Sequence, residues 1–542
     1  MRVLGINAVF HDSAAALVVD GQVVAAAEEE RFSRRKHGKR PVPFSAWELP
    51  ENAIRWVLSR AGLTGADLDA VAYSYDPDLA ADHGPGLDPG SEPIRTDFAR
   101  RAPLFLRTLL PRVDLGGFVF VRHHVAHAAS AGLLHPRGDC AVLTCDGRGE
   151  NTSMLAGHYL DGQLKILAEQ QLPHSLGLFY EDLTEHLGFA RSSDEYKVMA
   201  LASYGQPRFA ADLRERVHAT SGGHFVTEPI DWDGFVPRRE PTGPFDPQHA
   251  DLACSVQMVT EEVLLELTTW LHRATGAAHL AMAGGTALNC VANTRIHHEG
   301  PFESVWVQPA AGDSGTALGA ALAVSADAGD TIAPFPGADL GREFDDRDIA
   351  AQLTAARVPF ERPDDIGAAC AQILADDGIL AWFQGRSEFG PRALGHRSLL
   401  ANPSNERNLE RINDVKGREQ FRPIAPMVLA DRAAEIFSRG PIPSPYMLFV
   451  HDVHPDWRVR LPAVTHVDGT ARIQTVDRES DPQTAHLLEC VAEKTGVPVI
   501  VNTSLNTAGR PMVDSVLDAL ELFGSAPVDA MALGPFLVRR HD

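Results

Sequence analysis

Short apolar runs separated by turn residues open the chain. Residues 3–7, 14–19 and 23–28 are predominantly apolar, with polar or glycine residues between them. Runs of this kind are typical of β-strands joined by tight turns. The same pattern returns at residues 140–145 and 155–160, each followed by an Asp-Gly pair. This echo predicts a core that is duplicated within the N-terminal part of the chain.

Helical spacing of apolar residues follows in longer segments. It is found at residues 50–61, 121–134, 178–187, 252–274 and 316–326. The strand-like segments AHLAMAG and SVWVQP lie between the last two of these. Helices that alternate with strands predict an α/β fold.

A linker is expected at residues 328–343, AGDTIAPFPGADLGRE, which is rich in glycine, proline and alanine. A new helix is expected from Asp345 to Ala356, and a strand at residues 378–383. A chain of 542 residues is also too long for one hydrophobic core. We therefore expect two domains, residues 1–345 and 346–542.

Composition narrows the classes of partner. The formal net charge of -23 argues against nucleic acid or an anionic membrane as the main partner. No apolar run reaches the roughly 18–20 residues that a membrane-spanning helix needs. The first residues do not form a signal-peptide pattern, and the six cysteines include no CxxC pair. These features together predict a cytoplasmic protein.

Two histidines and two aspartates are candidate metal ligands. His123 and His127 are four residues apart on a predicted helix, so both imidazoles project from one face. Asp146 follows an apolar strand, and Asp313 lies in a glycine-flanked turn. Imidazole with carboxylate suits iron(II), manganese or zinc better than magnesium. Ordinary polar packing of the paired histidines is the alternative interpretation.

Three glycine-bearing loops are candidates for binding a nucleotide through backbone amides. They supply Gly147, Gly284 and Gly285 with Asn289, and Gly312. For each loop alone, a tight strand-to-helix turn is the alternative. Near the N-terminus, His11 and Asp12 fall in the first turn, and a histidine titrates near neutral pH as a general base should. Lys36 follows a charged run that also fits a solvated surface patch.

Basic residues are concentrated in one stretch of this acidic chain, residues 386–422. Guanidinium groups bind phosphate oxygens in a bidentate way, so the stretch predicts an anionic small ligand. A solvated loop is the alternative for any single arginine. The basic residues are Arg386, Arg392, Arg397, Lys416, Arg418 and Arg422, and further along the chain Arg472, Asn502, Ser504 and Asn506 form a similar oxyanion-recognising set.

The motifs taken together resemble the O-carbamoyltransferases of natural-product biosynthesis, which act on nodulation factors, tobramycin, cephamycins and novobiocin. They are HDSAA, ERFSRRKH, HHVAHAASA, EYKVMALASYG, GGTALN, GDSGTALGAA, GPRALGHRS, NDVKGREQFRP, HVDGTARIQTV and NTSLN. The resemblance runs from residue 3 to about residue 515 and keeps the family's order of motifs.

The resemblance implies a duplicated actin-like ATPase domain of the sugar-kinase and Hsp70 type, followed by a YrdC-like domain. Carbamoyl phosphate and Mg-ATP would form carbamoyl-adenylate in the second domain, and the first would pass the carbamoyl group to a hydroxylated natural product. His123, His127, Asp146 and Asp313 would hold iron(II), with His11 and Lys36 assisting transfer. The implied anion-binding residues are Arg392, Lys416, Arg418, Arg422, Arg472 and Ser504.

Other functions remain open at this point. The modules also suit a carbamoyl or threonylcarbamoyl transferase of tRNA modification or hydrogenase maturation, or a non-catalytic nucleotide-binding scaffold. Missing zinc-finger CxxC pairs argue against the hydrogenase version, and the charge of -23 argues against tRNA. We expect the acceptor to contact residues 76–118 and 220–250, whose sequence does not identify a particular acceptor. We also expect a homodimer.

Overall fold

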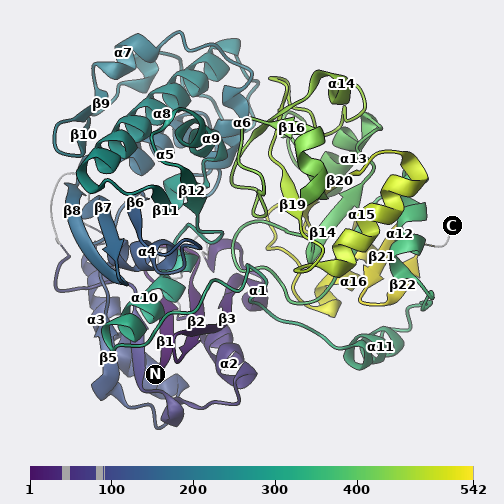
Figure 1. Cartoon of the computed structure of the whole chain (residues 1–542), viewed down its shortest axis with the longest axis horizontal. Coiled ribbons are helices and arrows are strands. Elements are labelled where there is room, and N and C mark those ends of the chain that lie inside the picture. Colours follow the sequence, from purple (N-terminus) through teal and green to yellow (C-terminus); the bar gives the residue numbers. More distant parts are fainter. Residues whose placement is uncertain (39–48, 81–89, 91, 541–542) are drawn as a thin grey trace. The chain divides into compact units, whose positions relative to one another are not determined.

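The computed structural model describes residues 1–38, 49–80, 90 and 92–540 (Figure 1). It forms two compact units, Met1–Gly337 and Ala338–Asp542. The division falls inside the segment 328–343, where we expect the linker, rather than at the boundary of 345 that we placed after it. Residues 81–89 and 91, part of the predicted acceptor region, lie outside the described residues.

The first sheet of the N-terminal unit has the strand order β3-β2-β1-β4-β5. Neighbours β3, β2 and β1 are antiparallel, whereas β4 and β5 run parallel to β1. The strands are β1 (Arg2–Asn7), β2 (Ala14–Val19), β3 (Gln22–Glu28), β4 (Ala70–Tyr73) and β5 (Phe118–Phe120).

A second sheet repeats this arrangement, with the order β8-β7-β6-β11-β12. Again the first two pairings are antiparallel and the last two parallel. Its strands are β6 (Cys140–Cys145), β7 (Thr152–Leu160), β8 (Gln163–Gln171), β11 (His279–Ala283) and β12 (Ser304–Val307). The repeat confirms the predicted duplication and the actin-like ATPase fold class.

Two alanine-rich helices pack between these sheets, α4 (His123–Gly132) and α10 (Ser314–Asp327). Helix α10 contacts β1 and β2, and α4 contacts β6 and β11 (Figure 1). A side chain on Gly319 would meet the carbonyl oxygen of Ala126 at 1.7 Å, so the helices approach closely because this residue is glycine. Helix α4 begins at His123, Asp313 is the N-cap residue of α10, and the side chains of these two residues lie close together.

Outer helices complete the N-terminal unit. The longest is α8 (Pro247–Thr275), which begins at a capping box formed by Asp246 and His249. Others are α2 (Glu51–Arg60), α3 (Glu92–Leu109), α5 (Leu176–His186), α6 (Glu195–Ala202) and α9 (Cys290–Glu299).

The C-terminal unit is built on one mixed sheet of order β19-β15-β20-β14-β13-β21-β22. Both faces are buried, because Trp382 packs in one apolar cluster and Phe383, the next residue, in the other. The strands are β13 (Leu380–Phe383), β14 (Arg397–Ala401), β15 (Ala425–Leu429), β19 (Gln474–Val476), β20 (Val499–Ser504), β21 (Ala530–Leu533) and β22 (Phe536–Arg539).

Helices cover the two faces of this sheet separately. Apolar residues of α12 (Ile366–Ala375) and α15 (Pro482–Thr495) pack with Trp382. Those of α11 (Asp346–Ala355), α13 (Arg407–Lys416) and α16 (Val516–Ser525) pack with Phe383. The second domain is therefore α/β, as predicted.

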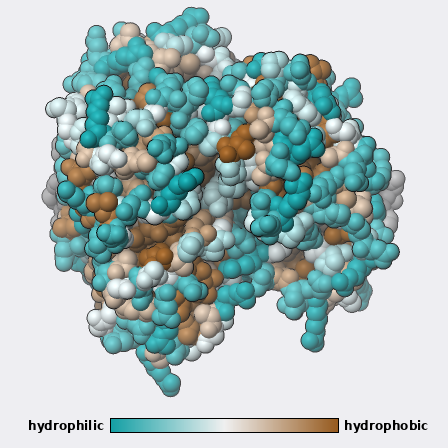
Figure 2. All heavy atoms as spheres, in the orientation of Figure 1, coloured by the Kyte–Doolittle hydropathy of each residue, from teal (hydrophilic) through white to brown (hydrophobic). Residues whose placement is uncertain are grey.

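The surface visible in Figure 2 is largely hydrophilic, with apolar residues in small groups. Among the described residues, no helix combines the length and the apolar content needed to cross a membrane.

Candidate functional site

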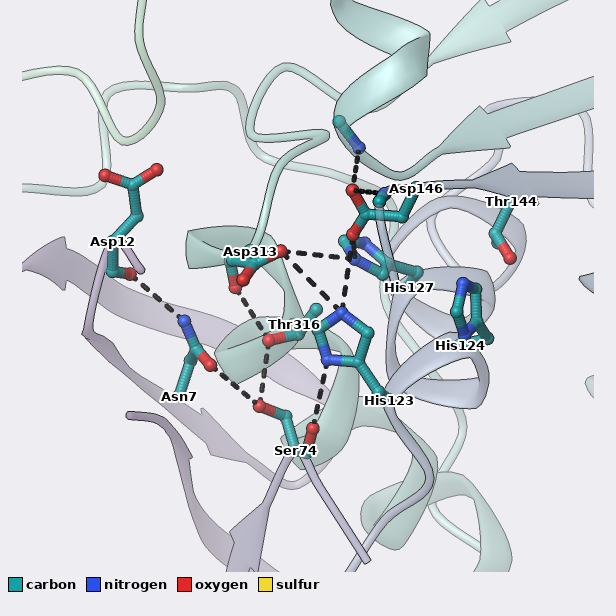
Figure 3. Close-up of polar contacts among 12 residues, drawn as sticks. Asn7, Asp12, Ser74, His123, His124, His127, Thr144, Asp146, Asp313 and Thr316 are labelled. Atoms are coloured by element: carbon teal, nitrogen blue, oxygen red, sulfur yellow. Dashed lines mark hydrogen bonds and ion pairs between the residues drawn. The ribbon is translucent and has the colours of Figure 1, made fainter. Parts of the chain in front are cut away.

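Four side chains converge at the meeting point of α4, β6 and α10 (Figure 3). They are His123, His127, Asp146 and Asp313, and their ligand atoms all lie within 4.8 Å of one another. The Nε2 atoms of His127 and His123 lie 3.0 and 3.4 Å from Oδ2 of Asp146. They lie 3.8 and 3.7 Å from Oδ1 of Asp313. Both imidazoles are fully buried.

Asp146 is oriented by the backbone of two loops. Its Oδ1 accepts hydrogen bonds from the amides of Gly147, at 2.8 Å, and Gly285, at 3.2 Å. Oδ2 is thereby left to face the imidazoles. Gly285 must be glycine for this contact, because an added Cβ would lie 2.9 Å from Oδ1. Gly284, at φ +89°, has no room either, since its Cβ would meet the carbonyl of Cys145 at 2.2 Å.

His123 is held as one tautomer. Its Nδ1 lies 3.3 Å from the carbonyl oxygen of Ser74, which can only accept a hydrogen bond. In the neutral ring Nδ1 therefore carries the proton, and Nε2 presents its lone pair to the cluster. Glu150 fixes the start of α4 by accepting from the backbone amide of His123 at 2.8 Å.

The charges of the cluster perturb one another. Burial raises the pKa of Asp146, but hydrogen bonds and charge from His123 and His127 outweigh burial and hold that pKa well below its usual value. Burial lowers the pKa of His127, but Asp146 and Asp313 outweigh it and raise the pKa to about 9. The two carboxylates thus favour positive charge at this point.

The residues fit a transition metal. Two imidazole nitrogens and two carboxylates form the donor set that iron(II), manganese and zinc accept. Oδ2 of Asp313 is buried and has no hydrogen-bond partner among the described residues. The neighbouring His124 is not one of the four clustered residues. Its Nδ1 lies 3.0 Å from the hydroxyl of Thr152.

His11 and Asp12 lie beside the cluster. Nε2 of His11 is 3.8 Å from Asp313, and its Nδ1 is 2.9 Å from Asp12. The second carboxylate oxygen of Asp12 lies 2.8 Å from Nδ1 of His37. Burial raises the pKa of Asp12, but the two histidines outweigh it and hold the pKa well below its usual value. Asp12 is therefore a charged group that orients His11.

Lys36 is half-buried in the short 3-10 helix Lys36–Gly38. Nε2 of the next residue, His37, lies 3.0 Å from the hydroxyl oxygen of Ser193. The structure thus brings Lys36 into the segment that contacts Asp12, and no contact between Lys36 and the four clustered residues is found in the described part of the chain.

The glycine-bearing loops differ in the contacts that they make with the four clustered residues. Gly147, Gly284 and Gly285 surround Asp146, so these loops support the cluster directly. Asn289 caps α9 by accepting from the amide of Ala292 at 3.1 Å, which is a structural role. Gly312 precedes Asp313, and the nearest atom to an added Cβ there lies 3.8 Å away.

In the C-terminal unit, Lys416 ends helix α13 and is buried. Its ammonium group donates to Oγ of Ser504 at 3.0 Å and to Oδ1 of Asn506 at 2.6 Å, and also contacts both backbone carbonyls. Three predicted residues therefore form one cluster at the end of β20.

The loops that carry Arg392 and Arg472 come to the same strand. Asn502 on β20 donates to the carbonyl of Ala393 at 3.2 Å and to Oε1 of Gln474 at 2.6 Å. Gln474 in turn donates to the carbonyl of Leu394 at 2.7 Å. Arg392 precedes Ala393, and Arg472 lies two residues before Gln474, so β20 gathers segments that are distant in sequence.

Other arginines of the basic stretch are used by the fold itself. Arg397 is fully buried, stacks on Phe383 with its guanidinium carbon 3.6 Å from the ring centroid, and donates to backbone carbonyls. Arg386 donates to the carbonyls of Leu340 and Gly341. These two arginines support the loop through contacts within the fold, and neither is among the anion-binding residues that the resemblance implies.

The last two predicted arginines make local contacts. Arg418 donates to Asn413 at 2.6 Å, and Arg422 lies 3.5 Å from Glu419 in a partly exposed ion pair. The Arg422 side chain is 16% exposed and Oε2 of Glu419 is buried, so Arg422 would have to leave a partly desolvated pair to bind a phosphate.

Sequence reasoning missed a carboxylate near His11. Glu195 begins α6, and burial, the largest influence, raises its pKa to about 7, with the charge of His11 opposing that shift. Perturbed groups of this kind concentrate at functional sites. The only sequence signal was its position in the motif EYKVMALASYG. His37 was missed as a partner of Asp12, and Ser193 as a partner of His37, because charged and serine-rich segments look like solvated loops.

Comparison with known proteins adds independent findings. The family model described as the carbamoyltransferase N-terminus matches residues 2–83, 97–222 and 238–322, and that described as the carbamoyltransferase C-terminus matches residues 371–540. The chain is 38% identical over 560 residues to nodulation protein NolNO of Sinorhizobium fredii, which covers 98% of this chain and 80% of that protein.

Two further comparisons give a close and a distant similarity. An uncharacterized protein of Synechocystis is 36% identical over 608 residues, covering 99% of this chain and 97% of its own length. Among solved structures, HypF of T. kodakarensis aligns at 15% identity with a TM-score of 0.37, covering 61% of this chain and 50% of that one.

Proposed function

The chain belongs to the carbamoyltransferase family, and from that premise we propose that it transfers a carbamoyl group from carbamoyl phosphate to a hydroxyl of a secondary metabolite, at the expense of ATP. The carbamoyl group would be activated in the C-terminal unit and transferred in the N-terminal unit. The observation that carries this proposal is the buried convergence of His123, His127, Asp146 and Asp313 beside His11.

Activation would use the cations gathered around β20. Water hydrolyses carbamoyl phosphate to carbamate and inorganic phosphate, a carbamate oxygen attacks the α-phosphorus of ATP, and pyrophosphate leaves. The product is carbamoyl-adenylate. Lys416, held by Ser504 and Asn506, would neutralise charge on the phosphates, and Arg392, Arg418, Arg422 and Arg472 would bind them as bidentate donors.

Transfer would use His11 as the base. The acceptor oxygen attacks the carbamoyl carbon, the bond between that carbon and the AMP oxygen breaks, and the hydroxyl proton passes to Nε2 of His11. Asp12 bonds Nδ1 of the ring, so it orients His11 and stabilises the protonated form. A metal ion held by His123, His127, Asp146 and Asp313, for which we propose iron(II) before manganese or zinc, would supply Lewis-acid stabilisation of the phosphate charge.

Residues of the chain would also keep the intermediate intact. The loops that carry Gly147, Gly284, Gly285 and Gly312 would border the AMP part. The amides of Gly147 and Gly285 already bond Asp146, and that of Gly284 bonds the carbonyl of Ala311. Lys36 would add positive charge near Asp12. We propose Mg-ATP as the bound form of the nucleotide, a hydroxylated natural product as the acceptor, a cytoplasmic location and a homodimer. Nucleic acid and membrane partners are not proposed.

The test is ATP consumption by the purified protein with and without carbamoyl phosphate. The proposal predicts release of phosphate and pyrophosphate only when both substrates are present. A nucleotide-binding scaffold would release neither, and a threonylcarbamoyl transferase would need threonine and bicarbonate in place of carbamoyl phosphate. Screening hydroxylated metabolites for the mass gain of one carbamoyl group would then identify the acceptor.

A further inference from the structure

A second group of potential metal ligands lies in the C-terminal unit, on helices that take no part in the proposed reaction. Asp365 precedes α12, and His486 and Cys490 lie on α15, which packs beside α12 (Figure 1). Nε2 of His486 is 2.9 Å from Oδ2 of Asp365 and 3.6 Å from Sγ of Cys490. One ligand atom from each side chain lies within 4.8 Å of the others.

Local structure fixes these three side chains in place. His486 and Cys490 are four residues apart, so they project from one face of α15. Asp365 caps α12, because its Oδ1 accepts from the amide of Ala368 at 2.9 Å. Both carboxylate oxygens face the imidazole, with Oδ2 2.9 Å and Oδ1 3.1 Å from Nε2. Gly367 gives the ring its space, because an added Cβ would lie 2.6 Å from Cδ2 of His486.

The arrangement differs from that of a thiol activated by a histidine and a carboxylate. In such a relay the thiol and the carboxylate bond opposite nitrogens of the ring. Here both are closest to Nε2, because Sγ lies 3.6 Å from Nε2 and 3.9 Å from Nδ1. The three donor atoms instead lie within 4.8 Å of one another, as metal ligands do.

We propose that Asp365, His486 and Cys490 form a second metal site, which takes a thiophilic divalent cation of the zinc class. At zinc bond lengths of about 2.0 Å to nitrogen and 2.3 Å to sulfur, a tetrahedral ion separates those two ligands by about 3.5 Å. The observed 3.6 Å needs almost no adjustment. Metal binding to Nε2 of His486 displaces the proton that lies between this nitrogen and Asp365.

The fourth ligand position is open to solvent. The side chains of His486 and Asp365 are 49% and 46% exposed, so water can complete the coordination. Cys490 is buried, which protects its sulfur from bulk solvent. A metal at this site joins α12 to α15 and stabilises their packing, a role separate from the oxygen- and nitrogen-only cluster of the N-terminal unit.

Cobalt(II) titration of the full-length protein tests the proposal. A cobalt-thiolate bond gives a near-ultraviolet charge-transfer band, and the four ligands of the N-terminal cluster include no sulfur. The proposal predicts this band in the unaltered protein, its loss on adding zinc, its loss in Cys490→Ser, and its retention in His127→Ala. Absence of the band in the unaltered protein, or its persistence in Cys490→Ser, overturns the proposal.

Two further variants separate metal binding from helix stability. Asp365→Asn keeps a good helix cap but removes a charged ligand, so cobalt affinity falls about tenfold or more while thermal unfolding without metal is unchanged. Gly367→Ala displaces the His486 ring and weakens the band in the same way. Gly524→Ala is the matched control, because its added Cβ meets no atom within 4 Å. Equal cobalt affinity in all three variants contradicts the site.

Discussion

The two clusters proposed for catalysis differ in how the fold uses their charge. In the N-terminal unit, the four clustered residues direct their donor atoms at one point, and Oδ2 of Asp313 has no hydrogen-bond partner within the described ranges. In the C-terminal unit, Arg397 donates to carbonyls and Lys416 to four oxygens. Donor atoms directed at one point therefore indicate a ligand more specifically than an accumulation of basic residues does.

The largest effect is expected from His127→Ala. Loss of one ligand removes the metal and with it the stabilisation of phosphate charge, so carbamoyl transfer should fall by at least about 1000-fold. Elemental analysis should find about one metal ion per chain fewer in the variant than in the unaltered protein.

The matched control is His124→Gln, because His124 lies on the same helix and contacts Thr152 in place of the cluster. Its metal content should be unchanged. Circular dichroism should find both variants folded. Full activity of His127→Ala in metal-free buffer would show that the cluster is structural.

Arg422→Ala tests the C-terminal cluster. Loss of a bidentate phosphate donor at a desolvated anion should cost about 2–4 kcal/mol, or roughly 30- to 1000-fold in adenylate formation. Pyrophosphate release measures this rate. Arg432→Ala is the control, since Arg432 forms an exposed pair with Glu435 and should leave the rate unchanged. Equal rates in both variants would mean that Arg422 belongs to a surface patch.

Gly285→Ala should have a smaller effect, confined to the N-terminal cluster. Its Cβ would lie 2.9 Å from Oδ1 of Asp146 and displace that carboxylate, so metal affinity should fall about 10- to 100-fold. Gly312→Ala has space for its methyl group and should keep the metal. Metal titration of both variants measures the difference, and equal affinities would contradict the positioning of Asp146 by the Gly285 loop.

The smallest effect is expected from Ser504→Ala. Lys416 keeps its contacts to Asn506, and one hydrogen bond of about 0.5–1.5 kcal/mol is lost. Adenylate formation should fall by about 2- to 13-fold. A loss as large as that of Arg422→Ala would mean that the hydroxyl contacts substrate directly.

Much of the N-terminal cluster could be predicted because local rules place its residues. The spacing of His123 and His127 places both on one face of a helix. Asp146 directly follows a strand, and Asp313 lies in the turn that precedes a helix. The role of Gly285 in holding Asp146 was beyond prediction, because it depends on two loops that are distant in sequence.

The C-terminal cluster could be predicted less well. Nothing local distinguishes Arg397, which packs on Phe383 inside the sheet, from Arg392 in the neighbouring loop. Their difference arises from the pairing of β14 with β20 and β13, which is a tertiary property. The overall α/β fold was predictable in both units, because apolar periodicity reports burial directly.

The central claim is that the two units carry out separable half-reactions, and synthetic carbamoyl-adenylate tests it most directly. Supplied to Arg422→Ala, the intermediate should restore carbamoylation of the true acceptor to near the unaltered rate, because His11 and the four clustered residues are intact. Supplied to His127→Ala, it should not, since that variant makes the intermediate but lacks the metal site. Rescue of both variants, or of neither, would contradict the division of labour between the two units.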